Sequence, residues 1–305
     1  MGKLAASPIK TAAKVVAKIP ASELPSTAAG IARMNLFSNS DDLALVQGSI
    51  VTHGPNKSGK SFLAGSISDA VGDVWPPKKK TVIDDVLWIA NDEGATAGFG
   101  EYGVRIEYVL DLWRIREKYR SILDANTAMM QAAYELFNKK KFKAVVDDTV
   151  SMMDKELVDY FSGTLANSNN KFEIYRMTLI THRRRHRDLS KLPCWKIFNF
   201  HTNVMTDDDS TRSRQKASGL PGGGQYILDI TGKARSVYCG NANLILAMGQ
   251  EPIPGKKDEY ARCVFTQPSA GFEAGSRWQV SLGKKEEPHL GKMLKKVAAQ
   301  LKKSM

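Results

Sequence analysis

The stretch VTHGPNKSGKSFLAG, residues 51–65, contains a glycine, four further residues and then Gly-Lys-Ser. This is the G-x-x-x-x-G-K-[ST] pattern of a phosphate-binding loop that joins a strand to a helix. Its glycines let backbone N–H groups curl around phosphate oxygens, its lysine reaches the β- and γ-phosphates, and its hydroxyl holds Mg²⁺. We therefore expect ATP and Mg²⁺ to bind here, with Lys60 acting in hydrolysis and Ser61 as a metal ligand. The residues expected to contact the nucleotide are Gly54, Pro55, Asn56, Lys57, Ser58, Gly59, Lys60, Ser61 and Phe62.

The sequence around the loop predicts an α/β fold with a mainly parallel sheet flanked by helices. Residues 44–53 indicate a strand that enters the loop, and 60–74 has apolar residues near helical spacing. Strands alternate with helical stretches further along, which is typical of parallel α/β folds. The additional predicted strands are 86–90, 143–152, 194–203, 234–249 and 260–267. Residues 104–140 are expected to be largely helical, with Ile106, Val109, Leu110, Trp113 and Ile115 as core contacts, and the C-terminal tail to end in a helix.

An acidic residue on a neighbouring strand is needed to hold the Mg²⁺ shell of such an ATPase. The stretch FKAVVDDTVSM, residues 142–152, supplies two aspartates at the end of an apolar strand. Alternation from Val146 favours Asp148, with Thr149 behind it, as the metal-site residue. Asp147 is the rival, and a pair of ordinary strand-end caps is the structural alternative.

Two other strand ends carry polar residues suited to hydrolysis. VLWIANDEGA, residues 86–95, ends in Asp92 and Glu93, and a carboxylate is needed to orient or deprotonate the attacking water. We expect Glu93 to be that base, with Asp92 second and a surface turn as the alternative. KIFNFHTN, residues 196–203, ends with His201, which could contact the γ-phosphate or be structural. His53, beside the loop, is expected to be a packing residue.

The chain of 305 residues has a formal net charge of +12 and a pI of about 9.5, which suits a polyanion such as nucleic acid. The positive charge gathers in residues 182–196, in the long glycine-rich stretch 203–225 and in the lysine-rich tail from 284. Mobile cations contact phosphates without reading sequence. A solvated helix face or a solubility tail is the alternative. The expected DNA-binding residues are Arg183, Arg184, Arg185, Arg212, Arg214 and Lys216.

The cysteines and the N-terminal residues bear on the compartment. The three cysteines lie far apart without a CxxC pair, which fits a reducing cytoplasm and argues against disulfides or a cysteine zinc site. No apolar run approaches the roughly 18 residues that span a bilayer. The first twenty residues have four lysines and no acid, and they lack the apolar core of a secretory signal. A transit peptide and a short amphipathic helix are alternative interpretations of these residues, and we favour a flexible basic arm.

Four motifs in fixed order resemble the RecA-like ATPase core, and most closely the small phage-encoded RecA-like ATPases of single-strand annealing and recombination. The segments that carry the resemblance are GPNKSGKS, VLWIANDEG, FKAVVDDTVSMM, IFNFHT and GFEAGSRW, and they span roughly residues 45–280. The chain departs from the family pattern at Asp147, where an apolar residue is usual. It also has Ala-Gly-Ser-Arg at 274–277 instead of a Lys-Asp-Arg pattern, and an insert at 75–85.

The resemblance implies a nucleotide held between subunits of a filament or ring, with DNA on inner loops. It implies that Glu93 is the catalytic glutamate, Asp148 the Mg²⁺-shell aspartate and His201 the γ-phosphate sensor. Residues 202–225 match the DNA-binding loop of the family. Arg277 stands where such proteins place a basic residue that reaches a neighbour's nucleotide.

These observations predict three parts: a flexible basic arm at 1–40, a RecA-like ATPase core at 41–283 and a lysine-rich tail at 284–305. The expected function is that of an ATP-dependent, single-stranded DNA-binding recombination or annealing ATPase. We expect it to form homo-oligomers, without a membrane, in the bacterial cytoplasm if it is phage-encoded. A DNA motor, such as a ring helicase or packaging ATPase, is one alternative. A nucleotide-dependent scaffold or loading factor and a small-molecule kinase are others.

Overall fold

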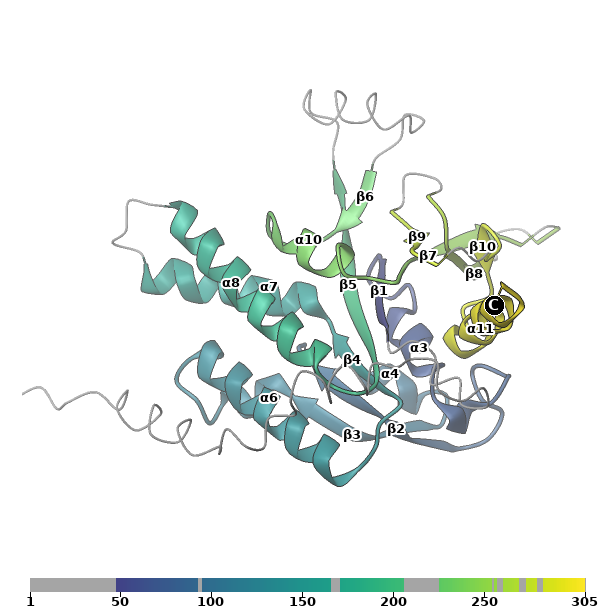
Figure 1. Cartoon of the computed structure of the whole chain (residues 1–305), viewed down its shortest axis with the longest axis horizontal. Helices are drawn as coiled ribbons and strands as arrows, with labels where there is room; N and C mark the ends of the chain where they lie inside the picture. The colour runs from purple at the N-terminus through teal and green to yellow at the C-terminus, as the bar shows by residue number, and fades with distance from the viewer. Residues whose placement is uncertain are drawn as a thin grey trace, which may run out of the picture. The chain divides into compact units, whose positions relative to one another are not determined.

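The computed structural model describes residues 48–92, 95–165, 171–205, 225–253, 255–256, 260–268, 273–278 and 282–304. Its sheet has the strand order β10-β8-β7-β1-β5-β4-β2-β3, and β6 and β9 pair with β5 and β7 (Figure 1). The six strands from β7 to β3 are parallel, and the other four are antiparallel additions. The strands are β1 (Ser49–Gly54), β2 (Thr81–Ala90), β3 (Val104–Asp111), β4 (Ala144–Asp148), β5 (Trp195–Met205), β6 (Gln225–Leu228), β7 (Leu244–Pro252), β8 (Tyr260–Phe265), β9 (Gly275–Ser276) and β10 (Lys285–Glu286).

The order of the central strands places the predicted motifs at one edge of the sheet. Strands β1 and β4 are buried along their whole length, as expected for parallel strands covered on both faces. Strand β5 separates them, and the three strands run in the same direction. The phosphate loop after β1, the aspartates of β4 and His201 of β5 therefore meet at the carboxyl edge, where parallel α/β sheets bind ligands. The predicted α/β fold, with a mainly parallel sheet flanked by helices, is confirmed.

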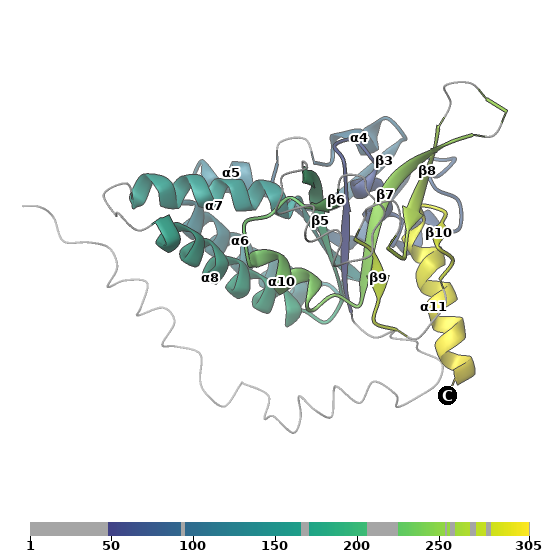
Figure 2. The same ribbon diagram turned by 90° about the horizontal axis from the view of Figure 1, so that it is seen from above.

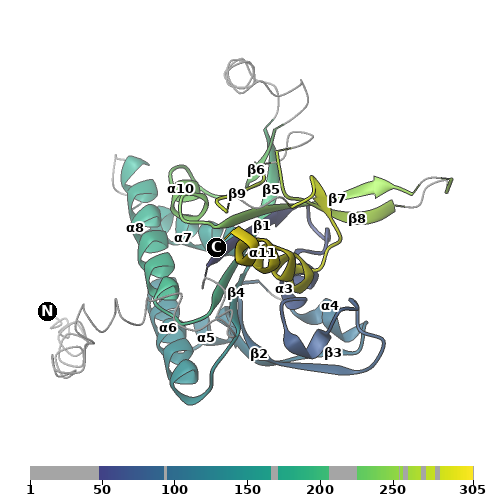
Figure 3. The same cartoon turned by 45° about the vertical axis from the view of Figure 1, so that its right-hand side comes forward.

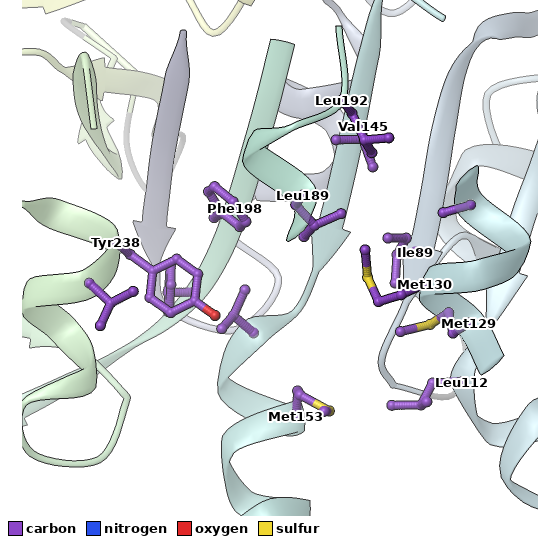
Figure 4. Close-up of a cluster of buried hydrophobic side chains, with 14 of the residues drawn as sticks. Ile89, Leu112, Met129, Met130, Val145, Met153, Leu189, Leu192, Phe198 and Tyr238 are labelled. Carbon is purple, nitrogen blue, oxygen red and sulfur yellow. The ribbon is translucent and has the colours of Figure 1, made fainter. Parts of the chain in front are cut away.

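Helices cover both faces of this sheet. A large core cluster joins the sheet to α5, α6, α7, α8 and α10 on one face, and Figure 4 shows part of it, including Met153 and Phe198. Figure 2 shows α11 on the other side of the sheet from α6, α7 and α8. The helices are α3 (Lys60–Gly65), α4 (Ala97–Gly100), α5 (Leu112–Arg116), α6 (Ile122–Lys139), α7 (Val150–Thr164), α8 (Lys171–Ser190), α10 (Ala234–Cys239) and α11 (Leu290–Ser304), with a 3-10 turn, η2 (Asp69–Val71).

The C-terminal helix α11 lies near the end of α3 (Figure 3). Its Leu290 N–H donates to Ser66 Oγ at 2.7 Å, and Leu290 and Val297 are fully buried. Its lysines are partly neutralised by carboxylates, because Lys295 pairs with Asp73 and Lys296 with Glu286. The predicted C-terminal helix is therefore confirmed. No helix of the described residues is long and apolar enough to span a membrane.

The expectation that residues 104–140 are mostly helical is wrong at the start of this range. Residues 104–111 form β3, because their apolar and polar residues alternate with the period of a strand. The strand turns the side chain of Val109 outward, and Trp113 on α5 is also exposed, so neither is a core contact. Leu112 is buried in their place.

Other element boundaries also differ from those predicted. The 234–249 stretch divides into helix α10 and strand β7, so the strand prediction is wrong for its first part. Helix α3 ends at Gly65, and the chain then turns through η2 instead of continuing to residue 74. Strand β2 begins at Thr81, earlier than predicted. Strand β6 pairs with the end of β5, so the predicted loop leaves from a two-stranded hairpin, with residues 206–224 outside the described part.

Candidate nucleotide-binding site

The phosphate loop has two glycine positions that no other residue could fill without strain. Gly59 has φ of 100°, in the left-handed region that favours glycine. A Cβ on Gly54 would lie 2.7 Å from Ser58 Oγ and 2.8 Å from the Cβ of Met248. The glycines predicted from the motif are thus required by backbone conformation at one position and by close packing at the other.

Lys60 and Ser61 lie where the first turn of α3 meets the loop. Lys60 Nζ donates to the carbonyl oxygens of Gly54 at 3.0 Å and Pro55 at 2.8 Å, so the ammonium lies inside the loop. Burial lowers the pKa of Lys60 to about 8, although Asp148 and Asp92 oppose that shift. The ammonium group of Lys60 is therefore close to Asp148, the predicted metal-site residue, and to Asp92, a candidate base for the attacking water.

Asp148 is the aspartate that reaches the loop. Its Oδ2 accepts a hydrogen bond from Ser61 Oγ at 2.6 Å, and its Oδ1 is buried without a hydrogen-bond partner among the described residues. Burial raises the pKa of Asp148 to about 6, and the polar side chains of Ser61 and Asn199 oppose the rise. Asp147, the rival, is directed elsewhere, because Asn91 Nδ2 donates to its Oδ1 at 2.5 Å.

These donors fit Mg²⁺. A hydroxyl oxygen and a carboxylate oxygen are hard ligands, and Mg²⁺ in nucleotide sites takes one or two such protein ligands and completes its shell with phosphate and water. The unpaired Oδ1 of Asp148 is a further oxygen available to a water of that shell. Ser61 and Asp148 would therefore hold the metal.

A pocket of about 710 Å³ brings the predicted residues together. Besides the loop, it is lined by Asp92, which follows β2, by Asp148 at the end of β4 and by His201 within β5. Burial raises the pKa of Asp92, and Asp92 Oδ1 is buried without a hydrogen-bond partner among the described residues. Glu93, the predicted base, lies outside the described residues. The loop residues that line the pocket are Asn56, Lys57, Gly59, Lys60, Ser61 and Phe62.

His201 is uncharged at neutral pH. Burial, together with the nearby cations Lys60 and Lys155, lowers its pKa to about 4. Its backbone N–H donates to Ser151 Oγ at 3.0 Å, and its position on β5 is paired with Gly54 on β1. A neutral imidazole in this place can donate an N–H to an anion without adding charge.

Aromatic side chains form one wall of the pocket. The ring of Phe62 stacks on Phe99 with 5.0 Å between centroids and meets the edge of Tyr102 at 4.6 Å. A smaller side pocket of about 120 Å³ continues past Phe62 and Tyr102 to Trp75 and Met248. The nucleotide pocket thus has a charged floor and an aromatic wall.

Arg262 is a pocket residue that sequence reasoning missed. It projects from β8 into the lining of both pockets, and its Nη1 would lie 3.3 Å from a Cβ on Gly59. The local sequence YARCVF indicated only a strand. Arg262 reaches the phosphate loop because β8 pairs antiparallel with β7, where it faces Gln250, and that pairing leaves no local signal in the sequence.

Arg277 is not brought to the pocket of its own chain. Its N–H donates to the Asn243 carbonyl at 2.9 Å, and it follows β9, which pairs with the first residues of β7. Those first residues of β7 pair with the start of β1, at the opposite end of the sheet from Gly54. A role for Arg277 at a neighbouring subunit's nucleotide stays a prediction.

The predicted DNA-binding residues divide into three groups. Arg183 and Arg184 are exposed on α8. Arg185 is 1% exposed and pairs with Asp147, so the expectation that it contacts DNA is wrong for this conformation. The helical period explains the difference, because residues 182, 185, 186 and 189 share the buried face of α8. Arg212, Arg214 and Lys216 lie outside the described residues.

No protein-family model matches the chain, and no curated protein is similar to it. Among solved structures, it is similar to the crystal structure of a KaiC-like protein from the hyperthermophilic archaeon Pyrococcus horikoshii OT3. The two are 12% identical, the match covers 76% of this chain and 83% of that chain, and the TM-score is 0.39. A likeness this weak says nothing about the site.

Proposed function

We propose that this protein binds ATP with Mg²⁺ in the pocket at the carboxyl edge of its sheet and hydrolyses it. One observation carries the proposal: the hydrogen bond of 2.6 Å from Ser61 to Asp148, beside Lys60 in the phosphate loop. The pocket that contains this pair also receives Asp92 and His201. A phosphate cradle, a metal-holding pair and a buried carboxylate in one cavity are the parts that phosphoryl transfer to water requires.

The residues have distinct tasks in the reaction. Water attacks the γ-phosphorus, the bond to the β–γ bridging oxygen breaks, and ADP and phosphate leave. Loop N–H groups and Lys60 stabilise the charge on the phosphate oxygens. Mg²⁺, when held by Ser61 and Asp148, would supply electrostatic stabilisation of the phosphate charge. A carboxylate accepts the proton of the water, and this is Glu93 by its sequence position or Asp92, whose raised pKa makes it a stronger base.

The aromatic wall suits the base of the nucleotide. A purine presents two flat faces, and aromatic rings bind such faces by stacking with partial burial. Tyr102 is 41% exposed and lines both pockets beside Phe62, so its ring is accessible to a base. We place the nucleobase against this wall and the phosphates in the loop.

We further propose that the partner is single-stranded DNA and that the process is recombination or annealing. The net charge of +12 and the exposed Arg183 and Arg184 support a polyanion partner. His53, directly before Gly54, contacts Thr202 Oγ1 through Nδ1 at 3.1 Å. Thr202 belongs to the hairpin that leads into the arginine-containing stretch 206–224. A chain of contacts thus joins the phosphate loop to the predicted DNA-binding loop.

We also propose that the active form is a homo-oligomer in the cytoplasm. Arg277 is exposed at the end of the sheet opposite its own pocket, so it can serve a nucleotide only on another subunit. The size of the particle, measured by light scattering with a non-hydrolysable ATP analogue, tests this part. A monomer at all protein concentrations would contradict it.

The central experiment measures ATP hydrolysis with and without single-stranded DNA, at low and at moderate salt. We expect hydrolysis that DNA stimulates and salt weakens, since phosphate contacts release counterions. Lys60→Ala is the matched control and should be inactive. An inactive wild type with bound Mg²⁺ and ATP would overturn the hydrolase assignment. Hydrolysis that ignores DNA would favour a scaffold or a small-molecule kinase, and strand unwinding would favour a motor.

A further inference from the structure

Arg185 on α8 makes four hydrogen bonds inside the protein. Its Nε donates to Asp147 Oδ2 at 2.9 Å, and its Nη2 donates to Asp147 Oδ1 at 2.6 Å and to Asn91 Oδ1 at 2.9 Å. Its Nη1 donates to Asn126 Oδ1 on α6. One guanidinium therefore links the ends of strands β2 and β4 to two helices.

The two strand partners of Arg185 stand next to the acids of the pocket. Asn91 directly precedes Asp92, and Asp147 directly precedes Asp148. The strand ends are also tied to each other, because the Asn91 N–H donates to the Asp148 carbonyl oxygen at 2.6 Å. A shift of either strand end would move its acid relative to Lys60 and Ser61.

Stability alone does not account for this arrangement. Burying an ion pair costs much of what the pairing returns, and apolar side chains of similar volume often stabilise a fold as well or better. The planar guanidinium, in contrast, fixes the direction of each bond, because its N–H groups form a rigid fork that matches a carboxylate. What Arg185 supplies beyond packing is a fixed spacing between two strand ends.

We propose that Arg185 is a positioning residue for ATP hydrolysis, which holds Asp92 and Asp148 at the spacing that the reaction needs. The inference rests on the proposed ATPase function. Arg185 does not touch the pocket, so its effect passes through Asn91 and Asp147. Because Asp148 would hold the metal, a displaced Asp148 should raise the Mg²⁺ concentration that gives half of the maximal rate.

The test compares Arg185→Lys with Arg176→Lys in the full chain. Both substitutions keep the charge and lie on α8, but Arg176 is exposed and pairs with Glu173, its neighbour one turn away. Arg185→Lys should lower kcat by about 10- to 100-fold and raise the Mg²⁺ concentration for half-maximal rate by a similar factor. Binding of a fluorescent ATP analogue with saturating Mg²⁺ should change much less. Arg176→Lys should behave as the wild type.

A second pair of variants covers the case in which Arg185→Lys does not fold. Asn91→Ala removes a partner of Arg185 at a strand end, and Asn126→Ala removes its partner on α6. Asn91→Ala should impair hydrolysis and the Mg²⁺ response more strongly than Asn126→Ala. Equal effects, or wild-type kcat and Mg²⁺ dependence in Arg185→Lys, would overturn the inference while leaving the ATPase function intact. Failure of the wild type to hydrolyse ATP would instead overturn the function itself.

Discussion

Two buried polar clusters of the protein differ in how completely their atoms are paired. At the nucleotide pocket, Ser58 Oγ, Asp92 Oδ1 and Asp148 Oδ1 are buried without a hydrogen-bond partner among the described residues. We call this group the open cluster. Unpaired buried polar atoms cost free energy, so a fold retains them where a ligand or water completes their bonding.

The second group, the closed cluster, joins α7, α8 and α10 behind the sheet. His182 contacts Asp154 Oδ1 through Nε2 at 2.8 Å and the Tyr238 hydroxyl through Nδ1 at 2.9 Å. The other oxygen of Asp154 accepts from the N–H and the hydroxyl of Thr231 at 2.8 and 2.5 Å. Every side chain here is used within the protein, which is typical of a structural network. Removing a group should therefore affect catalysis in the open cluster and stability in the closed one.

The largest effect should come from the carboxylate that activates water. Glu93→Gln should lower kcat by about 10²- to 10⁴-fold while ATP still binds, because general base catalysis contributes that much. Asp92→Asn, a neighbour with the same change, is the matched comparison and should have the smaller effect. Single-turnover hydrolysis measures the chemical step of each variant, and binding of an ATP analogue measures whether the nucleotide still binds. If Asp92→Asn is the inactive variant and Glu93→Gln is active, the base is Asp92 of the open cluster.

Asp148→Asn should cost activity without costing stability. Hydrolysis should fall by about 10²- to 10³-fold, since one electrostatic contact to the reacting charge is weakened. Burial raises the pKa of Asp148 to about 6 from an ordinary value of 3.8, so the folded state prefers the protonated acid. Its contribution to the free energy of unfolding is therefore present below pH 4 and lost as the pH rises through 6.

Without Mg²⁺ and nucleotide, the wild type should lose about 2 kcal/mol relative to Asp148→Asn between pH 4 and pH 7. One pKa unit corresponds to about 1.4 kcal/mol, and a small part of the effect is already lost at pH 4, where the unfolded carboxyl is partly ionised. Denaturant unfolding at both pH values measures the difference. Equal pH dependence in the two proteins would show that the carboxylate is not buried as described.

The sequence predicted the parts of the site that lie in short motifs. Gly54 to Ser61 form one contiguous motif, and Asp148 and His201 each stand at the end of a largely apolar stretch, so the local sequence pattern was enough to find them. Arg262 was missed because only the pairing of β8 with β7 brings it to the loop. The charge of the arginine run predicted that Arg185 contacts DNA at the surface. The helical spacing of His182, Arg185 and Leu189 instead indicates one buried face of α8. Strand β3 was missed for a similar reason, since the alternation of residues 104–111 was outweighed by the helical pattern that follows.

The smallest effect on catalysis should come from His182→Ala, which breaks the closed cluster. The change leaves the buried groups of Asp154 and Tyr238 without their partner, and each unsatisfied group costs about 1–3 kcal/mol. Burial raises the pKa of Tyr238 well above its ordinary value, so its hydroxyl cannot relieve the loss by ionising. We expect the free energy of unfolding to fall by about 2–4 kcal/mol. The kcat per active site, counted by bound analogue, should stay within about twofold of the wild type, because no member of this cluster lines the pocket. If His182→Ala instead lost much of its kcat at unchanged stability, the closed cluster would also serve the reaction. The assignment of catalysis to the open cluster and stability to the closed cluster would then be wrong.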